Sequence, residues 1–224
     1  HSHFTHIDAN YPFAPQDKNT VIARKIGQLY HECIDDVLNL LSHDDLQKAL
    51  RLLNNAKTIC LVSSGVQSEI AQTFKDKMLK IGKCVIVETK MDQAFYHACY
   101  CDQTWAFVMI SYSGETKSII QMAGTCVQRQ IPFITMTSYG ENTLSHMGNA
   151  KLYISTRENL RNNIANFNSN LSISFLLDVL YSAYFSINYK ENFEYKIAVT
   201  KKLEYNRHST NPILSDLEEE NEQC

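Results

Sequence analysis

Residues 107–117 read Phe-Val-Met-Ile-Ser-Tyr-Ser-Gly-Glu-Thr-Lys, and the architecture of the chain can be worked out from them. An apolar run, 106–110, stops at short hydroxyl residues and a glycine, and an amphipathic segment, 118–130, follows at once. This order predicts a buried parallel strand whose loop opens onto a helix N-terminus. Free backbone N–H groups and the positive end of a helix dipole meet at such a place. The stretch therefore suits an anion, of which phosphate is the commonest small example.

A second interpretation of the same residues needs no ligand. Ser113 or Thr116 could simply cap the helix, with Gly114 making the turn. This stretch alone leaves both interpretations open.

Strand-length apolar runs and helical patterns alternate along the rest of the chain. We expect strands at 58–63, 84–88, 104–111, 132–137 and 151–155, and helices at 19–41, 46–53, 70–81, 91–100, 116–130 and 163–187, with a polar loop around Leu144 and Met147. The strands are apolar throughout, which is typical of a sheet covered on both faces. The pattern predicts an α/β fold: a three-layer α-β-α sandwich with a five-stranded, mostly parallel, doubly wound sheet.

Two loops at expected strand ends carry hydroxyl groups and a glycine. One is 111–116, and the other is Ser63-Ser64-Gly65-Val66-Gln67-Ser68. Because ligands of doubly wound sheets bind outside the carboxyl ends of the strands, the pair favours a phosphorylated small molecule. The dinucleotide fingerprint Gly-x-Gly-x-x-Gly and the ATP-type phosphate loop are both missing from the sequence.

Composition narrows the class of protein further. The net charge is −3 and acidic residues concentrate at 216–222, which is the wrong balance for DNA binding by this chain itself. Apolar runs are too short to span a bilayer and no secretory signal is visible, so we expect a cytoplasmic protein with reduced thiols. Neither Cys99-Tyr-Cys101 nor His1, His3 and His6 argues for a metal, and no cofactor is expected. The first residue is not Met, which suggests an excised piece of a longer protein.

The chain resembles the SIS (sugar isomerase) domain, in the version found in RpiR-type bacterial transcriptional regulators. The stretch 111–117 matches the family's Ser-x-Ser-Gly-x-Thr phosphate motif completely, and 59–83 is similar to its first strand and helix. Residues 8–13 and 22–29 resemble the linker after the regulators' DNA-binding part, and 176–181 resembles their late helix. The likeness runs over residues 8 to 190, and it implies an arm at 1–19, the SIS domain at 20–190, and a C-terminal helix with an acidic tail at 191–224.

The resemblance implies a site for a sugar phosphate. The residues that it assigns to the ligand are Ser63, Ser64, Gly65, Gln67, Ser111, Ser113, Gly114, Thr116 and Ser169. One departure concerns the first loop, which usually reads Gly-x-Gly-x-Ser: Ser63 stands at the first glycine and Gln67 at the serine. This change bears on which sugar phosphate binds.

The same resemblance implies that the chain senses the sugar phosphate while a helix-turn-helix segment reads DNA. No such module precedes residue 8, so we expect this chain to be the effector-binding part of a regulator of carbohydrate metabolism. The sequence does not separate repressor from activator. DNA would be contacted only through the missing segment, and the family favours a homodimer or homotetramer.

Two other functions stay open, an aldose–ketose phosphate isomerase and a module that has lost its ligand. An isomerase needs a general base, for which the candidates are Glu69, Glu115, Glu158 and His208. Since none stands out, we expect no enzyme and name no catalytic residue.

Charged and aromatic clusters outside the two loops also allow two interpretations each. Arg157 and Arg161 could line the site, or could pair with Glu158 or the acidic tail. The aromatic residues of the late segment could form a partner surface, or could serve the packing of the two terminal helices against each other: Tyr181, Tyr184, Phe185, Tyr189, Phe193 and Tyr195.

Overall fold

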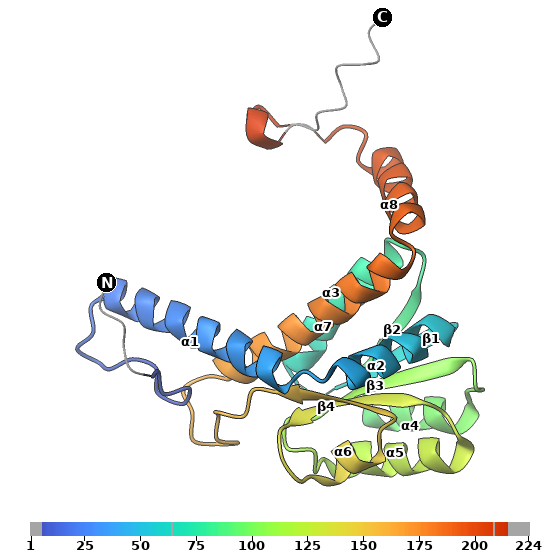
Figure 1. Ribbon diagram of the computed structural model, residues 1–224, viewed down its shortest axis with the longest axis horizontal. Coiled ribbons are helices and arrows are strands. Elements are labelled where there is room, and N and C mark those ends of the chain that lie inside the picture. The colour runs from blue at the N-terminus through green and yellow to red at the C-terminus, as the bar shows by residue number, and fades with distance from the viewer. Residues whose placement is uncertain (1–5, 64, 208, 215–224) are drawn as a thin grey trace, which may run out of the picture.

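A computed structural model describes residues 6–63, 65–207 and 209–214 (Figure 1). The strands are β1 (Thr58–Val62), β2 (Cys84–Glu88), β3 (Trp105–Ile110), β4 (Phe133–Ser138) and β5 (Ala150–Ile154). The helices are α1 (Asn19–Leu40), α2 (His43–Asn55), α3 (Gln67–Leu79), α4 (Met91–Tyr100), α5 (Lys117–Arg129), α6 (Thr143–Met147), α7 (Phe167–Ile187), α8 (Tyr189–Leu203) and the short 3₁₀ helix η1 (Pro212–Leu214).

The five strands form one sheet in the order β2-β1-β3-β4-β5, and every neighbouring pair is parallel. The α/β sandwich expected from the sequence is confirmed, and its sheet is parallel throughout rather than mostly. The chain runs outward from β1 to β2 and then returns to β3 on the other side of β1. The strand order therefore reverses between β1 and β3, where ligands of such sheets bind.

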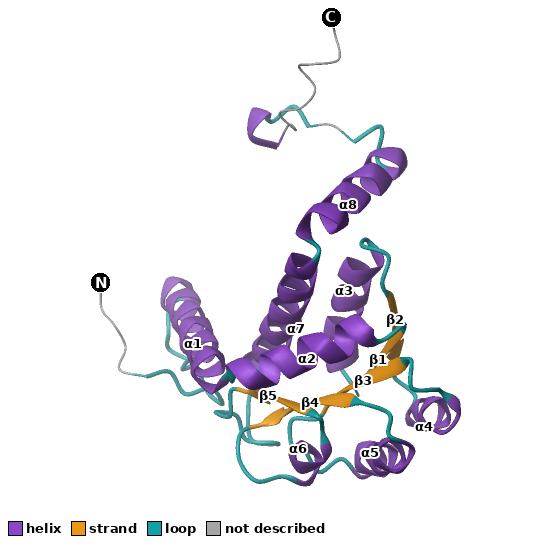
Figure 2. Ribbon diagram, turned by 45° about the vertical axis from the view of Figure 1, so that its right-hand side comes forward, coloured by secondary structure: helices purple, strands orange, loops and turns teal. Residues whose placement is uncertain are grey.

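Helices cover both faces of the sheet, as Figure 2 shows. On one face α2, α3 and α7 pack on a core that includes Phe74, Met78 and Leu176. On the other face α4, α5 and α6 enclose a second core with Phe107, Met122 and Phe133. The central strands β1 and β3 are buried between the two layers, which explains why they are apolar at almost every position rather than at every second one.

Two expectations about elements were wrong. The segment around Leu144 and Met147 is not a polar loop but contains α6, whose N-cap Asn142 accepts a hydrogen bond from the backbone N–H of Ser145 at 2.9 Å. The long late helix begins at Phe167 rather than at residue 163. Both errors concern the position where a helix begins. Local hydrogen bonds determine that position, and the spacing of hydrophobic residues does not indicate it.

The described part of the N-terminal arm is packed against the domain. Ile7 and Ala9 are buried in a small cluster with Leu29 of α1 and Phe167 of α7. The backbone N–H of Ile164 also donates to the carbonyl of Asn10 at 2.9 Å. The arm thus lies along the junction of α1 and α7.

Helix α7 is a core helix, although its length and apolar composition alone would suffice to cross a membrane. Ile173, Leu176, Leu177 and Leu180 are buried against α1, α2, α3 and the sheet. Helix α8 differs, since none of its residues is buried and it projects away from the sheet (Figure 1).

Candidate functional site

The hydroxyl loop, residues 111–116, lies at the carboxyl end of β3, beside the point where strand order reverses. Ser111 Oγ and Thr116 Oγ1 lie 2.8 Å apart and share a hydrogen bond. Ser113 Oγ accepts the backbone N–H of Glu115 at 3.1 Å. The hydroxyl groups of the loop are thus gathered in front of α5 and bond to one another or to the loop backbone.

The N-terminus of α5 carries no side-chain cap. Its N-cap residue is Thr116, whose hydroxyl turns to Ser111 instead of the helix. The first backbone N–H groups of a helix have no partner within it, so here they are open to an acceptor from outside. The capping interpretation of Thr116 is therefore wrong, and the cap is left to water or to an anion.

Gly114 allows the loop to close against α6. Its φ of +67° is in the left-handed region, and a Cβ at this position would lie 2.0 Å from Asn142 Oδ1. The carbonyl of Gly114 also accepts the backbone N–H of Leu144 at 3.0 Å. Asn142 and α6 thus shape the loop from behind, a contribution that the sequence did not reveal because α6 itself was missed.

The first loop follows β1 on the neighbouring strand. Val62 pairs with Met109, so Ser63, the next residue, lies beside the start of the hydroxyl loop. Ser63 is fully buried, and its Oγ has no hydrogen-bond partner among the described residues. A buried hydroxyl without a partner costs about 1–3 kcal/mol, which marks this atom as one that a ligand group could satisfy.

The other residues of the first loop that were expected near the ligand differ in their surroundings. Gly65 has a φ of +65° and makes the turn, and Gln67 is the half-buried first residue of α3. Ser68 is bonded to the carbonyl of Gly65 at 2.7 Å. Ser64 lies outside the described residues.

Ser169 is engaged by a carboxylate. Glu158, which is buried, accepts the Ser169 hydroxyl at 2.7 Å, and it also accepts the backbone N–H groups of Asn168 and Ser169 at the start of α7. Glu158 therefore caps α7, where a negative charge complements the helix dipole. The alternative in which Glu158 pairs with Arg157 or Arg161 was therefore wrong.

Tyr112 joins the hydroxyl loop to this cap. Its hydroxyl donates to the carbonyl of Glu158 at 2.8 Å and accepts the Glu158 backbone N–H at 3.2 Å. Burial raises the pKa of Tyr112 to about 12, so the phenol stays a neutral donor. Tyr112 occupies the variable position of the Ser-x-Ser motif. Because the motif does not specify the residue at that position, it did not indicate a role for Tyr112.

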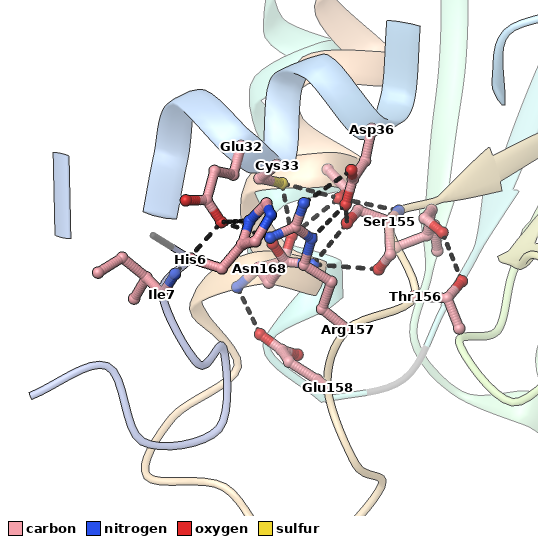
Figure 3. Close-up of polar contacts among 12 residues, drawn as sticks. His6, Ile7, Glu32, Cys33, Asp36, Ser155, Thr156, Arg157, Glu158 and Asn168 are labelled. Carbon is pink, nitrogen blue, oxygen red and sulfur yellow. Dashed lines mark hydrogen bonds and ion pairs between the residues drawn. The ribbon is translucent and has the colours of Figure 1, made fainter. Parts of the chain in front are cut away.

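Arg157 points toward Glu32 and Asp36 of α1, as Figure 3 shows. Its guanidinium bonds both oxygens of Asp36, at 2.5 and 2.9 Å, and pairs with Glu32. The pKa of Arg157 is raised, first by hydrogen bonding to Asp36. The suggestion that it lines the ligand site was wrong for this reason. Arg161 is exposed.

Among the groups considered as general bases, Glu115 and Glu158 are engaged in hydrogen bonds and Glu69 is exposed. Glu115 accepts the Thr143 backbone N–H and hydroxyl at 2.7 and 2.9 Å, which lowers the pKa of Glu115. Glu69 is exposed on the first turn of α3, and His208 lies outside the described residues. Glu158 already receives three hydrogen bonds at α7.

Cysteine chemistry and metal binding find no support in the described residues. Six cysteines there are unpaired, and no group of three or more His, Cys, Asp or Glu residues could hold a metal ion. Burial raises the pKa of the Cys60 and Cys126 thiols to about 12, so both remain protonated.

A parallel sheet with two hydroxyl loops at its switch point defines a doubly wound α/β domain with a candidate anion site at the carboxyl ends of its strands. Residues 52–183 match the SIS domain family, and this chain belongs to it. Curated relatives include the uncharacterized HTH-type transcriptional regulator YbbH of Bacillus subtilis, 24% identical over 167 residues, which are 75% of this chain and 59% of the relative. An HTH-type transcriptional regulator of Thermotoga maritima is 24% identical over 143 residues, covering 64% of this chain and 51% of that protein. The chain thus spans between half and two thirds of their length.

Several solved structures share the fold of this chain. The Vibrio vulnificus NanR protein complexed with ManNAc-6P superposes with a TM-score of 0.76 at 21% identity, over 87% of this chain and 72% of that one. The sugar isomerase domain of an RpiR transcription factor from Sphaerobacter thermophilus gives a TM-score of 0.67 at 13% identity, over 78% of this chain and 97% of the other. A Listeria monocytogenes protein described as a candidate sugar-phosphate isomerase gives a TM-score of 0.65 at 13% identity, over 81% of this chain and 98% of the other. At these identities the likeness establishes the fold.

Proposed function

We propose that this chain is the sugar-phosphate-sensing domain of an HTH-type transcriptional regulator of carbohydrate metabolism. The observation that carries the proposal is the uncapped N-terminus of α5 behind a complete hydroxyl loop. Ser111, Ser113 and Thr116 would donate to the phosphate together with backbone N–H groups of 113–116, and Gly114 would let the anion approach the backbone. The protein would act in the cytoplasm, where sugar phosphates are formed.

The sugar itself would lie toward the first loop. Ser63 supports this direction, because its buried hydroxyl has no partner among the described residues. Gly65 and Gln67 would approach the sugar from the same side; Ser64 belongs to the same proposed set but lies outside the described residues. Ser169 would take part only if it left Glu158, to which it is bonded at 2.7 Å.

DNA reading would belong to a helix-turn-helix segment outside this chain. The named HTH-type relatives, of which this chain covers about half to two thirds, support that arrangement. We further propose a homodimer, which the exposed aromatic residues of α8 support. Packing between the two terminal helices does not account for these aromatics, because α1 and α8 lie far apart in Figures 1 and 2.

A thermal-shift panel tests the proposal directly. Ligands that bind the folded state raise the melting temperature by mass action, so hexose, pentose and N-acetylamino-sugar phosphates are compared with their unphosphorylated forms. We expect at least one phosphorylated compound, and no free sugar, to stabilise the protein. The response should disappear in Ser113→Ala/Thr116→Ala and persist in Thr125→Ala, a change on the same helix far from the loop. An equal response of all three proteins would rule out the anion site.

Isomerase activity is the alternative, because the solved neighbours include the Listeria protein described as a candidate sugar-phosphate isomerase. Glu158 would be the carboxylate to test for such an activity, since it is buried and its backbone is bonded to Tyr112 of the hydroxyl loop. Incubating the stabilising compound with the protein and recording proton spectra separates the two functions. We expect unchanged ligand; catalytic turnover that is lost in Glu158→Gln would favour the enzyme.

A further inference from the structure

Tyr112 ties the hydroxyl loop to a distant part of the chain. Its backbone lies between Ser111 and Ser113, and its side chain is held by both backbone polar groups of Glu158. The Tyr112 carbonyl also accepts the N–H of Ser138 at 2.9 Å. A shift of the loop at Tyr112 would therefore pull on residue 158.

The residue before Glu158 holds α1. Arg157 makes a two-pronged contact with Asp36 and an ion pair with Glu32, and Ser155 Oγ adds a hydrogen bond to Asp36 at 2.6 Å (Figure 3). Guanidinium–carboxylate pairs of this kind fix geometry as well as distance. Two adjacent residues, Arg157 and Glu158, thus connect the hydroxyl loop on one side with α1 on the other.

Helix α1 is attached to the domain through its second half. Its buried residues are Leu29, Cys33 and Val37, and none of its residues before Leu29 is buried. Glu32 also lies 3.4 Å from the backbone nitrogen of Ile7, which donates to it, so the arm converges on the same carboxylate. A change at Arg157 would reach both α1 and the arm.

The hydroxyl loop has to rearrange when an anion enters. Ser111 Oγ and Thr116 Oγ1 satisfy each other, and Ser113 Oγ serves the N–H of Glu115. A phosphate would take these hydroxyl donors for itself, because charge-assisted hydrogen bonds are stronger than neutral ones. The loop would therefore have a second hydrogen-bonding arrangement when an anion is bound, with Tyr112 in the middle of the loop.

We propose that Tyr112 and Arg157 transmit occupancy of the hydroxyl loop to α1, which makes α1 the output element of the sensing domain. This inference rests on the proposed function of the loop. It assigns Tyr112 and Arg157 positioning roles, because neither is required to touch the ligand. The differential affinity that such coupling needs comes from the two arrangements of the loop.

Hydrogen exchange of the whole chain tests the coupling. N-acetylmannosamine 6-phosphate and inorganic phosphate serve as probes, and exchange is followed in the hydroxyl loop and in residues 29–40 of α1, with and without each probe. We expect a probe to slow exchange in the loop and to change the exchange rates in α1 by about fivefold or more, the lower range of typical coupling. In Tyr112→Phe and in Arg157→Lys the loop should still respond while the response of α1 is lost.

Matched variants separate coupling from general loosening. Tyr181→Phe and Arg129→Lys are the same substitutions at positions outside the proposed connection. In both variants the hydroxyl loop and α1 should still respond to the probe. If the loop responds but α1 does not in the unmodified protein, or if α1 still responds in both Tyr112→Phe and Arg157→Lys, the coupling is wrong and the sensing function stands. If neither probe nor any compound of the thermal-shift panel affects the loop, the proposed function fails and the coupling fails with it.

Discussion

At the scale of single residues, the site contains a buried polar atom that lowers the stability of the fold when no ligand is bound. Ser63 Oγ is buried and has no partner among the described residues, so Ser63→Ala should raise the free energy of unfolding without ligand by about 1 kcal/mol. The same substitution should weaken sugar-phosphate binding. Urea titration and the ligand-induced shift of the melting temperature measure the two effects. A variant that is less stable and binds equally well would show that Ser63 serves only the fold.

Gly114 supports a second prediction at this scale. Gly114→Ala should destabilise the protein through left-handed strain of about 1–2 kcal/mol and through the collision of its Cβ with Asn142. Gly65→Ala provides the matched control, since Gly65 has nearly the same φ but no described atom within 4 Å of the place that a Cβ would take. Urea denaturation should therefore show a larger loss for Gly114→Ala. Equal losses would mean that Asn142 moves aside freely.

At the scale of elements, the attachment of α1 should depend on pH. Burial alone would raise the pKa of Glu32 and of Asp36, but the pKa of both is lowered. Hydrogen bonds from Gln28 and then Arg157 lower the pKa of Glu32, and hydrogen bonds from Arg157 and Ser155 lower that of Asp36, with the charge of Arg157 adding to both. Carboxylates with lowered pKa values stabilise the fold above the pKa of the unfolded chain, and this contribution is lost as pH falls through the folded value. Arg157→Gln should cost about 2 kcal/mol near pH 7.

The difference in unfolding free energy between the original protein and Arg157→Gln should shrink as the pH falls below the ordinary pKa values of these carboxyls, 4.5 for Glu32 and 3.8 for Asp36. Chemical denaturation of both proteins at a series of pH values measures this difference in unfolding free energy. Arg129→Gln, which lies on α5 away from these carboxylates, should show no such convergence. A difference that stays constant with pH would assign the effect of Arg157 to packing instead of charge.

The elements also show which features the sequence could reveal. The strand 84–88 and the helix 91–100 were predicted at their observed bounds, because an apolar run and a helical period are patterns that the local sequence shows directly. Helix α6 was missed because a five-residue helix is too short to show a period and depends on the Asn142 cap. The hydroxyl loop was found from its motif. Its supports, Tyr112 and Asn142, could not be found, since they act through contacts with residues 158 and 114 that only the fold brings near.

At the scale of the whole molecule, an aromatic row begins at the end of α7, where Tyr181 packs against the domain core, and continues into α8, where the domain does not bury it. Tyr181, Phe185, Tyr189 and Phe193 form successive ring contacts with centroids 5.9, 5.2 and 6.4 Å apart. Tyr189 and Phe193 are 62% and 48% exposed, and no residue of α8 is buried. Exposed aromatics at this density are typical of interface centres, where Tyr and Phe are enriched.

The proposed homodimer therefore predicts that Phe193→Glu gives a monomer. A charge placed among stacked rings at an interface would have to be desolvated, which an assembly of modest area does not tolerate. Lys202→Glu introduces the same residue on the same helix, nine positions on and so about half a turn around it, and should leave assembly intact. Light scattering after size exclusion, over a range of concentrations, measures the mass. If the original chain is monomeric throughout that range, the aromatic row has another partner; if Phe193→Glu remains a dimer, the interface lies elsewhere on the domain.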